Sequence, residues 1–519
     1  MISLLIASAP APPAVARPRQ AFHAKVAPRP VAIWAGIALL TLAVLLVHGW
    51  HPWADDAGIY DAGILHLMHP ELYRPDAQFV AAHTHLSLFA HVLAALAAWT
   101  HLPLPLLLLV THLVSIVLFL LACRAVAQRL FARTAEVWCA TALAAACFTL
   151  PIAGTSLFLM DPYVTARSFS TPLSLFALAA ILGHRWGRAA LLLVLAILLH
   201  PLMGLYAVTF LALLALVELG FPRGAILLAA EYVTGALILF LISLRTHATA
   251  AYHQAVGSRV YLLPSRWEPW EWLGLVMPVI LFLLAARNSQ VSPGIRRLCG
   301  TAVLSAVTFV ALSVLFVHPA GSMLLVRLQP LRSFHLLYAI GVLLLGGLLG
   351  HVSFSSVHGR RARAMAFILV AVVASIFYQS QRSTMPFSAH IEWPGLKPRN
   401  PWSQAFLWIA HNTPRDAVFA SDPDLVLLPG EDTQSFRAAA RRSLLADYKD
   451  EGVAVVFPEL ADSWHRQYAA QEGIESMTDA ERLARLRPFG VQWLLLPIHT
   501  PTGFDCPYRN IAAQVCRLP

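Results

Sequence analysis

Charged residues are scarce in this 519-residue sequence, where Asp, Glu, Lys and Arg together make up only 12% of the chain. A soluble protein of this size carries roughly twice that fraction. Hydrophobic residues reach 58%, and many of them form runs of roughly 17–20 residues, long enough to cross a bilayer as helices. The composition therefore excludes an ordinary soluble fold and predicts an α-helical polytopic membrane protein.

Other features are also missing, and each absence narrows the function. No Cys-x-x-Cys or His-x-x-x-His spacing indicates a zinc site. The net charge of +10 does not indicate nucleic-acid binding, because most basic residues flank the apolar runs, where membrane orientation explains them. The N-terminal apolar stretch is too short for a signal peptide. Four of the six cysteines are ordinary small residues of the apolar runs, while pairing of Cys506 with Cys516 stays open.

The basic clusters at the ends of the apolar runs predict the topology. Residues 1–30 are expected to form a disordered cytoplasmic tail. Residues 31–380 are expected to form a transmembrane domain of about eleven spans, with clusters such as CRAVAQRLFAR and GHRWGR inside. The third and fourth spans are expected at about 135–153 and 171–182. Residues 381–519 lose this hydropathy and predict a small α/β domain outside the cytoplasm. The expected location is a bacterial inner membrane, with this domain in the periplasm.

Local patterns add detail to this organisation. A large first external loop, residues 51–102, includes an interfacial or re-entrant helix at 85–100. A full span there would place the next basic cluster outside the cytoplasm, against the positive-inside tendency. The apolar run from 189 to 219 is broken at His200 and Pro201, since proline disfavours helix just before it. The two short helices on either side are of the kind that line a cavity. Further along, PWSQAFLWIAHNT predicts an amphipathic helix, residues 417–420 and 491–496 predict strands, and Thr478 with Glu481 predicts a capping box.

The first external loop gathers acids in a chain that has few of them. Its sequence, HPWADDAGIYDAGILHLMHPELYRPDAQF, contains Asp55, Asp56, Asp61, Glu71 and Asp76. Carboxylates held at a bilayer surface are costly to desolvate, so such a cluster is a candidate functional site. The alternative is a solvated loop whose acids face water.

Several basic residues lie on the external side, against the orientation rule. Arg327 and Arg332 in MLLVRLQPLRSF have no acidic neighbour in the sequence, and a phosphate would explain them because a guanidinium forks onto two phosphate oxygens. The alternatives are lipid headgroups or an acid elsewhere in the fold. Arg167 is similar, although Asp161 can neutralise it. His200 is either a catalyst or a hairpin-tip residue.

Together, an Asp-rich first external loop, interfacial helices, many spans and an extracytoplasmic C-terminal domain resemble the GT-C superfamily of membrane glycosyltransferases. More narrowly, DDAGIY, PELYRPDAQF, DPYVTARSFSTPLSL, HPLMGLYA and FRAAARRSLLADYK are similar to an uncharacterised bacterial branch of membrane proteins. The resemblance implies a polyprenyl-phosphate or diphosphate sugar donor and a first-loop acid that serves as general base or metal ligand. The tail contains no WWD-type motif, which disfavours an oligosaccharyltransferase.

Carried over to this sequence, the acidic role falls on Asp55 or Asp56. Asp56 is slightly preferred, with Tyr60 one helical turn later on the same face. Adjacent aspartates are expected to raise each other's pKa, and a Mg²⁺ or Mn²⁺ ion is compatible with the pair without being required. Arg327, Arg332 or such an ion would stabilise the leaving phosphate.

The expected activity is sugar transfer from a polyprenyl-phosphate-linked donor to a glycan or protein acceptor on the outer face of the membrane. The alternative is a transporter or scaffold with a degenerate GT-C fold. An enzyme predicts that the acids and arginines converge on one external cavity, a transporter predicts a polar path, and a scaffold predicts scattered residues. The tail's basic residues, including Arg437 and Lys449, either face solvent or cap the site.

Overall fold

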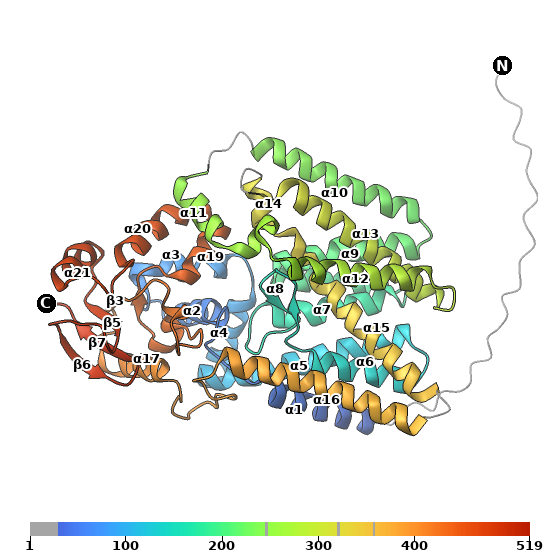
Figure 1. The fold of residues 1–519 in the computed structure, drawn as a ribbon, viewed down its shortest axis with the longest axis horizontal. Coiled ribbons are helices and arrows are strands. Elements are labelled where there is room, and N and C mark those ends of the chain that lie inside the picture. Colours follow the sequence, from blue (N-terminus) through green and yellow to red (C-terminus); the bar gives the residue numbers. More distant parts are fainter. Residues whose placement is uncertain (1–29, 244–247, 319–321, 356–358) are drawn as a thin grey trace, which may run out of the picture.

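The computed structural model describes residues 30–243, 248–318, 322–355 and 359–519, and its helices lie side by side with a mixed domain at one end (Figure 1). Within these residues, eight helical segments are long and apolar enough to cross a membrane. These are α1 (Pro30–His48), α5 (Leu104–Leu130), α9 (Pro201–Glu218), α10 (Pro222–Ser243), α12 (Pro269–Arg287), α13 (Pro293–Phe316), α14 (Met323–Leu328) continuing into α15 (Phe334–Ser355), and α16 (Gly359–Thr384). The predicted polytopic helical fold is confirmed, whereas the predicted N-terminal tail lies outside the described residues except for Pro30.

Three further predicted spans correspond to shorter helices, namely α6 (Thr134–Ala146), α7 (Arg167–Ile181) and α8 (Trp186–Leu199). The span predicted at 135–153 is wrong at its end. The helix stops at Ala146, and the chain then forms a small hairpin of β1 (Pro151–Ile152) and β2 (Leu157–Phe158). Helix α7 begins four residues before the predicted 171, so Arg167 lies in its first turn.

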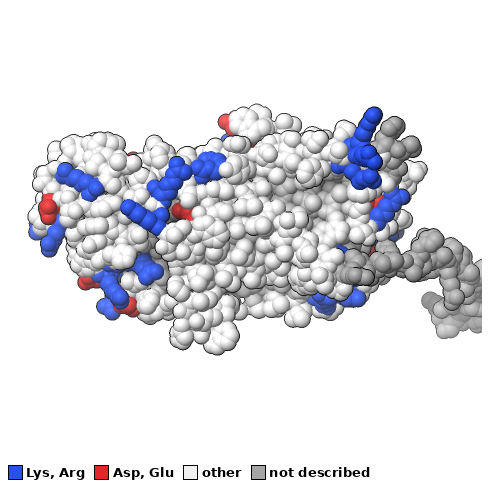
Figure 2. All heavy atoms as spheres, turned by 90° about the horizontal axis from the view of Figure 1, so that it is seen from below, with Lys and Arg blue, Asp and Glu red and all other residues white. Residues whose placement is uncertain are grey.

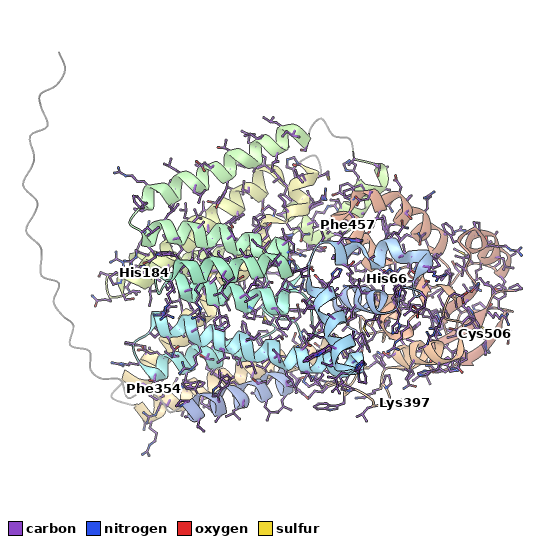
Figure 3. The ribbon with its side chains drawn as sticks, turned by 180° about the vertical axis from the view of Figure 1, so that it is seen from behind. His66, His184, Phe354, Lys397, Phe457 and Cys506 are labelled. Atoms are coloured by element: carbon purple, nitrogen blue, oxygen red, sulfur yellow. A yellow bond between two sulfur atoms is a disulfide. The ribbon has the colours of Figure 1, made fainter. Side chains whose placement is uncertain are left out.

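Charged side chains gather toward the two ends of the molecule, and the face in Figure 2 shows a broad band between them with few charges. Figure 3 shows His184 and Phe354 at one end, with Lys397 and Cys506 at the other. The first end carries the loops with the predicted cytoplasmic basic clusters. Two of these clusters meet at this end, because a Cβ added to Gly183 would lie only 2.9 Å from the guanidinium carbon of Arg129. This distribution is the one expected for helices surrounded by lipid.

The first loop folds into short helices: α2 (Ala57–Met68), α3 (Ala77–Val80) and α4 (Phe89–Thr100). Helix α4 has 12 residues and so spans about 18 Å, less than the roughly 30 Å of a hydrocarbon core. Its length is therefore that of the predicted interfacial or re-entrant helix and is too short for a full span.

The C-terminal residues form the predicted α/β arrangement. Its five-stranded sheet has the order β4 (Ser443–Leu444), β3 (Val418–Ala420), β5 (Trp493–Pro497), β7 (Ala513–Arg517) and β6 (Asp505–Arg509). Strand β3 is parallel to β4 and β5, and β7 is antiparallel to β5 and β6. A disulfide between Cys506 and Cys516 joins β6 to β7, which settles the pairing that the sequence left open.

Helices surround this sheet: α17 (Pro401–Asn412), α18 (Phe436–Ala440), α19 (Tyr448–Val456), α20 (Ala461–Gln471) and α21 (Asp479–Leu486). As predicted, α17 buries Trp402, Phe406 and Ile409 on one face. The predicted capping box is also present, because Thr478 and Glu481 exchange hydrogen bonds at the start of α21.

The first loop is fastened to this C-terminal region by backbone contacts. The N–H of Asp55 donates to the carbonyl of Thr433 at 2.8 Å, and the N–H of Ser435 donates to the carbonyl of Trp53 at 2.9 Å. Gly58 permits the approach, since a Cβ at that position would lie 2.2 Å from the Cβ of Ser435. The acidic pair is therefore held against residues that follow it by nearly 400 positions.

Candidate functional site

A cavity of about 400 Å³ lies between the first loop, the break from α8 to α9, helix α14 and helix α19. Six of the eight residues that the sequence singled out line it: Asp56, Tyr60, Arg167, His200, Arg327 and Arg332. Much of the remaining wall is apolar, from residues such as Ile59, Leu86, Leu199, Leu202 and Leu205. Asp56 and the three arginines thus share one cavity, as expected for an enzyme, whereas Asp55 and Asp161 do not line it.

The broken helix builds one wall of this cavity. Helix α8 ends at Leu199 and α9 begins at Pro201, with His200 in an extended conformation between them. A Cβ on Gly204 would lie 2.7 Å from backbone atoms of Ile197, so the glycine lets the two helices pack closely beside the break. The ring of His200 accepts the N–H of Met203 at 3.4 Å, which gives this histidine a capping function in addition to its place on the cavity wall.

Asp56 lies immediately before α2, and its side chain makes no capping bond to that helix. Its carboxylate accepts hydrogen bonds from both terminal nitrogens of Arg167 at 3.3 Å. Asp161 does not line the cavity. It holds Arg167 from behind, with its carboxylate 3.2 Å from Nε of the arginine and 3.0 Å from the hydroxyl of Thr165. Asp161 therefore positions Arg167, and Arg167 in turn holds Asp56.

Two further residues belong to the site, of which the sequence left Lys449 open between facing solvent and capping the site and did not single out His83. Lys449, in the first turn of α19, forms ion pairs with Asp55 and with Asp56, the latter at 3.3 Å. His83 also lines the cavity, with its ring edge-on to Tyr60 at 5.9 Å. Lys449 stood in the basic tail cluster, but no local spacing linked it to the first loop. His83 had no sequence signal beyond its place in that loop.

The charges around Asp56 set its ionisation. Burial by itself raises the pKa of Asp56, but the positive charges of Lys449 and two arginines outweigh burial and hold it well below its usual range. The expectation that the adjacent aspartate raises the pKa is therefore wrong for Asp56. Burial raises the pKa of Tyr60 to about 12 and lowers the pKa of His83 to about 4, so both are uncharged at neutral pH.

Arg327 and Arg332 differ from Arg167 in having no carboxylate within ion-pair distance among the described residues. Arg327 donates to the carbonyl of Val456 at 2.8 Å. Arg332 lies 5.6 Å from the ring of Tyr261, and its buried Nε has no hydrogen-bond partner in the described part of the chain. A buried N–H without a partner is costly, so an anionic ligand that accepts this N–H would be bound favourably here.

The other first-loop acids lie away from the cavity. Asp76 is buried and bound by Arg437 at 2.5 Å. Asp61 is buried within α2, and neither of its oxygens has a hydrogen-bond partner among residues that the structure describes. Glu71 lies at the surface near Arg415, at 3.5 Å.

The residues present do not fit a resident divalent cation at Asp55 and Asp56. In residues 30–519, apart from the short segments left undescribed, no group of three or more His, Cys, Asp or Glu side chains is placed to hold a metal ion. The Lys449 ammonium also contacts both carboxylates. Mg²⁺ requires near-octahedral oxygen ligands, and a neighbouring ammonium repels it.

Residues 400–467 match the family model described as "Domain of unknown function (DUF6798)". This stretch runs from α17 into α20 and includes Lys449 and Arg437. No curated protein sequence matches the chain.

Two solved structures are similar to the chain as a whole. One is the archaeal oligosaccharyltransferase AglB from Archaeoglobus fulgidus, in complex with an inhibitory peptide and a dolichol-phosphate, with a TM-score of 0.42, 12% identity, and coverage of 90% of this chain and 69% of that chain. The other is the arabinofuranosyltransferase AftD from Mycobacteria, with a TM-score of 0.43, 12% identity, and coverage of 91% and 35%. This chain thus spans about a third of the length of AftD. Both are named as glycosyltransferases, and the function of this chain has to follow from its own cavity.

Proposed function

We propose that this protein is a membrane glycosyltransferase that moves a sugar from a polyprenyl-phosphate-linked donor to an acceptor hydroxyl at the extracytoplasmic face of the membrane. The observation that carries the proposal is that Asp56, Arg327 and Arg332 line one cavity. Carboxylate and guanidinium groups are brought together there in a chain that is otherwise poor in charge. The acceptor is a glycan or a protein, and the membrane is the inner membrane of a bacterium, with the N-terminus in the cytoplasm.

The two arginines suit the phosphate of the donor. A phosphodiester carries one negative charge, and a guanidinium can donate two parallel hydrogen bonds to its oxygens. The leaving polyprenyl phosphate carries more charge than the bound donor, so preformed donors stabilise it more strongly as the bond breaks. Arg327 and Arg332 therefore assist departure of the lipid phosphate.

The apolar part of the wall suits the polyprenyl chain. Leu86 and Leu205 line the cavity while keeping 45% and 43% of their surface exposed. Large apolar side chains at a cavity rim contact lipid at little cost when the rim lies in a bilayer. A lipid-linked donor can thus enter from the membrane with its phosphate directed at the arginines.

The proposed reaction requires one proton transfer. The acceptor oxygen forms a bond to the anomeric carbon, while the bond from that carbon to the phosphate oxygen breaks and leaves its electron pair on the phosphate. The acceptor's proton passes to the Asp56 carboxylate and then to solvent. Because the pKa of Asp56 is depressed, this aspartate is a weak base, and the proton moves late, when the acceptor oxygen has gained positive charge. Tyr60, protonated at neutral pH, can donate a hydrogen bond to the sugar.

The test uses the purified full chain with a panel of radiolabelled polyprenyl-phosphate sugars. Wild type, Asp56→Asn, Asp55→Asn and Arg327→Ala are compared for sugar transfer or release, and thermal unfolding checks the fold of each variant. We expect Asp56→Asn to lower turnover by about 10²–10⁴-fold, the usual contribution of a positioned general base. Absence of turnover with every donor in wild type, with lipid binding unchanged in all variants, would favour the scaffold instead.

A further inference from the structure

Lys449 reaches the acidic pair from the opposite end of the sequence. Its ammonium contacts the carboxylates of both Asp55 and Asp56, while its own side chain is only 18% exposed. Tyr163 donates a further hydrogen bond to Asp55 at 2.9 Å. The two carboxylates thus share one cation, which is the position that a bridging metal ion would otherwise take.

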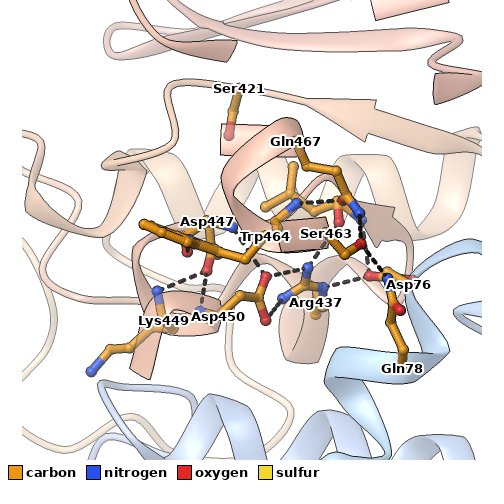
Figure 4. Close-up of polar contacts among 12 residues, drawn as sticks. Asp76, Gln78, Ser421, Arg437, Asp447, Lys449, Asp450, Ser463, Trp464 and Gln467 are labelled. Atoms are coloured by element: carbon orange, nitrogen blue, oxygen red, sulfur yellow. Dashed lines mark hydrogen bonds and ion pairs between the residues drawn. The ribbon is translucent and has the colours of Figure 1, made fainter. Parts of the chain in front are cut away.

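The backbone of Lys449 is fixed by a capping box at the start of α19. The side chain of Asp447 accepts the N–H groups of Lys449 at 2.8 Å and Asp450 at 3.1 Å (Figure 4). In the same view, the Lys449 side chain leads away from the neighbouring Arg437 cluster. A capped helix end leaves the backbone of Lys449 little freedom, so its side chain extends toward the acidic pair from a fixed position.

The residues on either side of Lys449 are fastened as well. Arg437 forms an ion pair with Asp450 at 2.7 Å. Arg259 pairs with Glu451 at 2.7 Å and lies 3.7 Å above the ring of Tyr448. Two buried arginines therefore hold this helical turn through ion pairs, as expected when the charge of Lys449 is preorganised and not carried on a mobile surface side chain.

The local charges are balanced without a metal ion. Three carboxylates, Asp55, Asp56 and Asp161, are faced by three cations, Lys449, Arg167 and Arg332, of which Arg332 acts on Asp56 through its electrostatic field and not by direct contact. A divalent ion added to this group would meet positive charge on several sides. Such repulsion is strong at short range in a partly buried site, where water screens it poorly.

We propose that Lys449 serves as a built-in cation for the acidic pair, so that the site works without a divalent metal ion. Lys449 is then a positioning residue, which holds Asp55 and Asp56 together and keeps Asp56 directed at the cavity. The meaning of this role for catalysis rests on the proposed function. Its test does not, because metal binding by the acidic pair can be measured without any sugar donor.

The experiment measures Mn²⁺ binding to the purified full chain by the loss of the free-ion EPR signal. We expect no saturable binding to wild type. Lys449→Ala removes the ammonium and leaves two carboxylates facing an open position, so we expect it to bind Mn²⁺ at least about tenfold more tightly than wild type. The double variant Lys449→Ala/Asp55→Asn should lose this gain.

Lys397→Ala is the matched control, because Lys397 is exposed and lies far from the cavity. It should leave Mn²⁺ binding unchanged. Saturable binding to wild type that disappears in Asp55→Asn would overturn the proposal, and this result does not depend on how well the lysine variants fold. No gain in a Lys449→Ala variant that unfolds at the wild-type temperature would also overturn it. A failure of the glycosyltransferase assay alone would leave the Mn²⁺ result standing.

Discussion

Among the ion pairs that involve the first loop and the C-terminal region, two sets differ in how far their side chains are exposed to solvent. At one, Arg437 binds Asp76 and Asp450 with all three side chains less than 10% exposed. At the other, Lys449 binds Asp55 and Asp56, whose side chains are 36% and 31% exposed. The first set lies in the packed interface, whereas Asp56 borders a cavity of about 400 Å³.

This difference distinguishes ion pairs that only hold the two segments together from ion pairs that border a ligand-binding cavity. The nitrogens of Arg437 reach Asp76, Asp450 and the carbonyl of Leu444, so all three nitrogens of this guanidinium are engaged within the protein. Asp56 keeps one face toward the cavity. Acid–base pairs between the same two segments thus differ in the cavity that reaches them, which is about 30 Å³ at Arg437 and Asp450 and about 400 Å³ at Asp56.

The largest effect on stability is expected when the cation of the buried set, Arg437, is removed. Arg437→Ala leaves Asp76 and Asp450 buried without their cation, which costs about 3–5 kcal/mol of stability. Thermal unfolding in detergent and limited proteolysis should show a loosened C-terminal region. The control is Arg441→Ala in the same segment, an exposed residue that should change stability by less than about 0.5 kcal/mol. An equal change of stability in the two variants would mean that the ion pairs of Arg437 with Asp76 and Asp450 do not hold the loop in place.

The next effect concerns Arg332, which has no carboxylate partner among the described residues. Arg332→Ala should weaken binding of a polyprenyl phosphate by about 30–160-fold, because a charge-assisted hydrogen bond contributes about 2–3 kcal/mol. The unfolding temperature should change little or rise, since the removed charge is half-buried and has no carboxylate partner among the described residues. Thermophoresis in nanodiscs measures the affinity, with the exposed Arg399→Ala as control. Unchanged affinity in Arg332→Ala would remove this residue from the phosphate site.

Part of this comparison could be predicted from the sequence. Asp56, Arg327 and Arg332 stood out because charge beside an apolar run breaks a strong local pattern. The partners of these acids did not stand out, because Lys449 lies 394 residues from Asp55 and Arg437 lies 361 residues from Asp76. No local periodicity encodes contacts over such separations. The early end of α6 was missed for a related reason, since the apolar run continues past Ala146 into a buried hairpin.

Gly58→Ala tests whether close docking of the first loop holds the acids in place. Alanine in a helix is ordinarily favourable by up to about 1 kcal/mol. Here its Cβ would lie 2.2 Å from that of Ser435, so we expect a net destabilisation of about 1–3 kcal/mol by overpacking. Gly235→Ala in α10 is the control, because a Cβ added there would have no atom of the described residues within 4 Å beyond its own helix backbone and chain neighbours. It should be neutral or stabilising in the same unfolding assay.

The smallest effect is a shift in pH dependence. In wild type, the depressed pKa of Asp56 keeps this residue ionised, so kcat/KM should stay flat down to about pH 5. Lys449→Met removes one of the charges that lower the pKa, while Arg167, Arg332 and the like-charged Asp55 still face Asp56. The pKa of Asp56 must then rise, which moves the acid limb of the profile to higher pH. A purely structural lysine would lower the whole profile without moving its limb, so the position of the limb distinguishes an electrostatic role of Lys449 from a packing role.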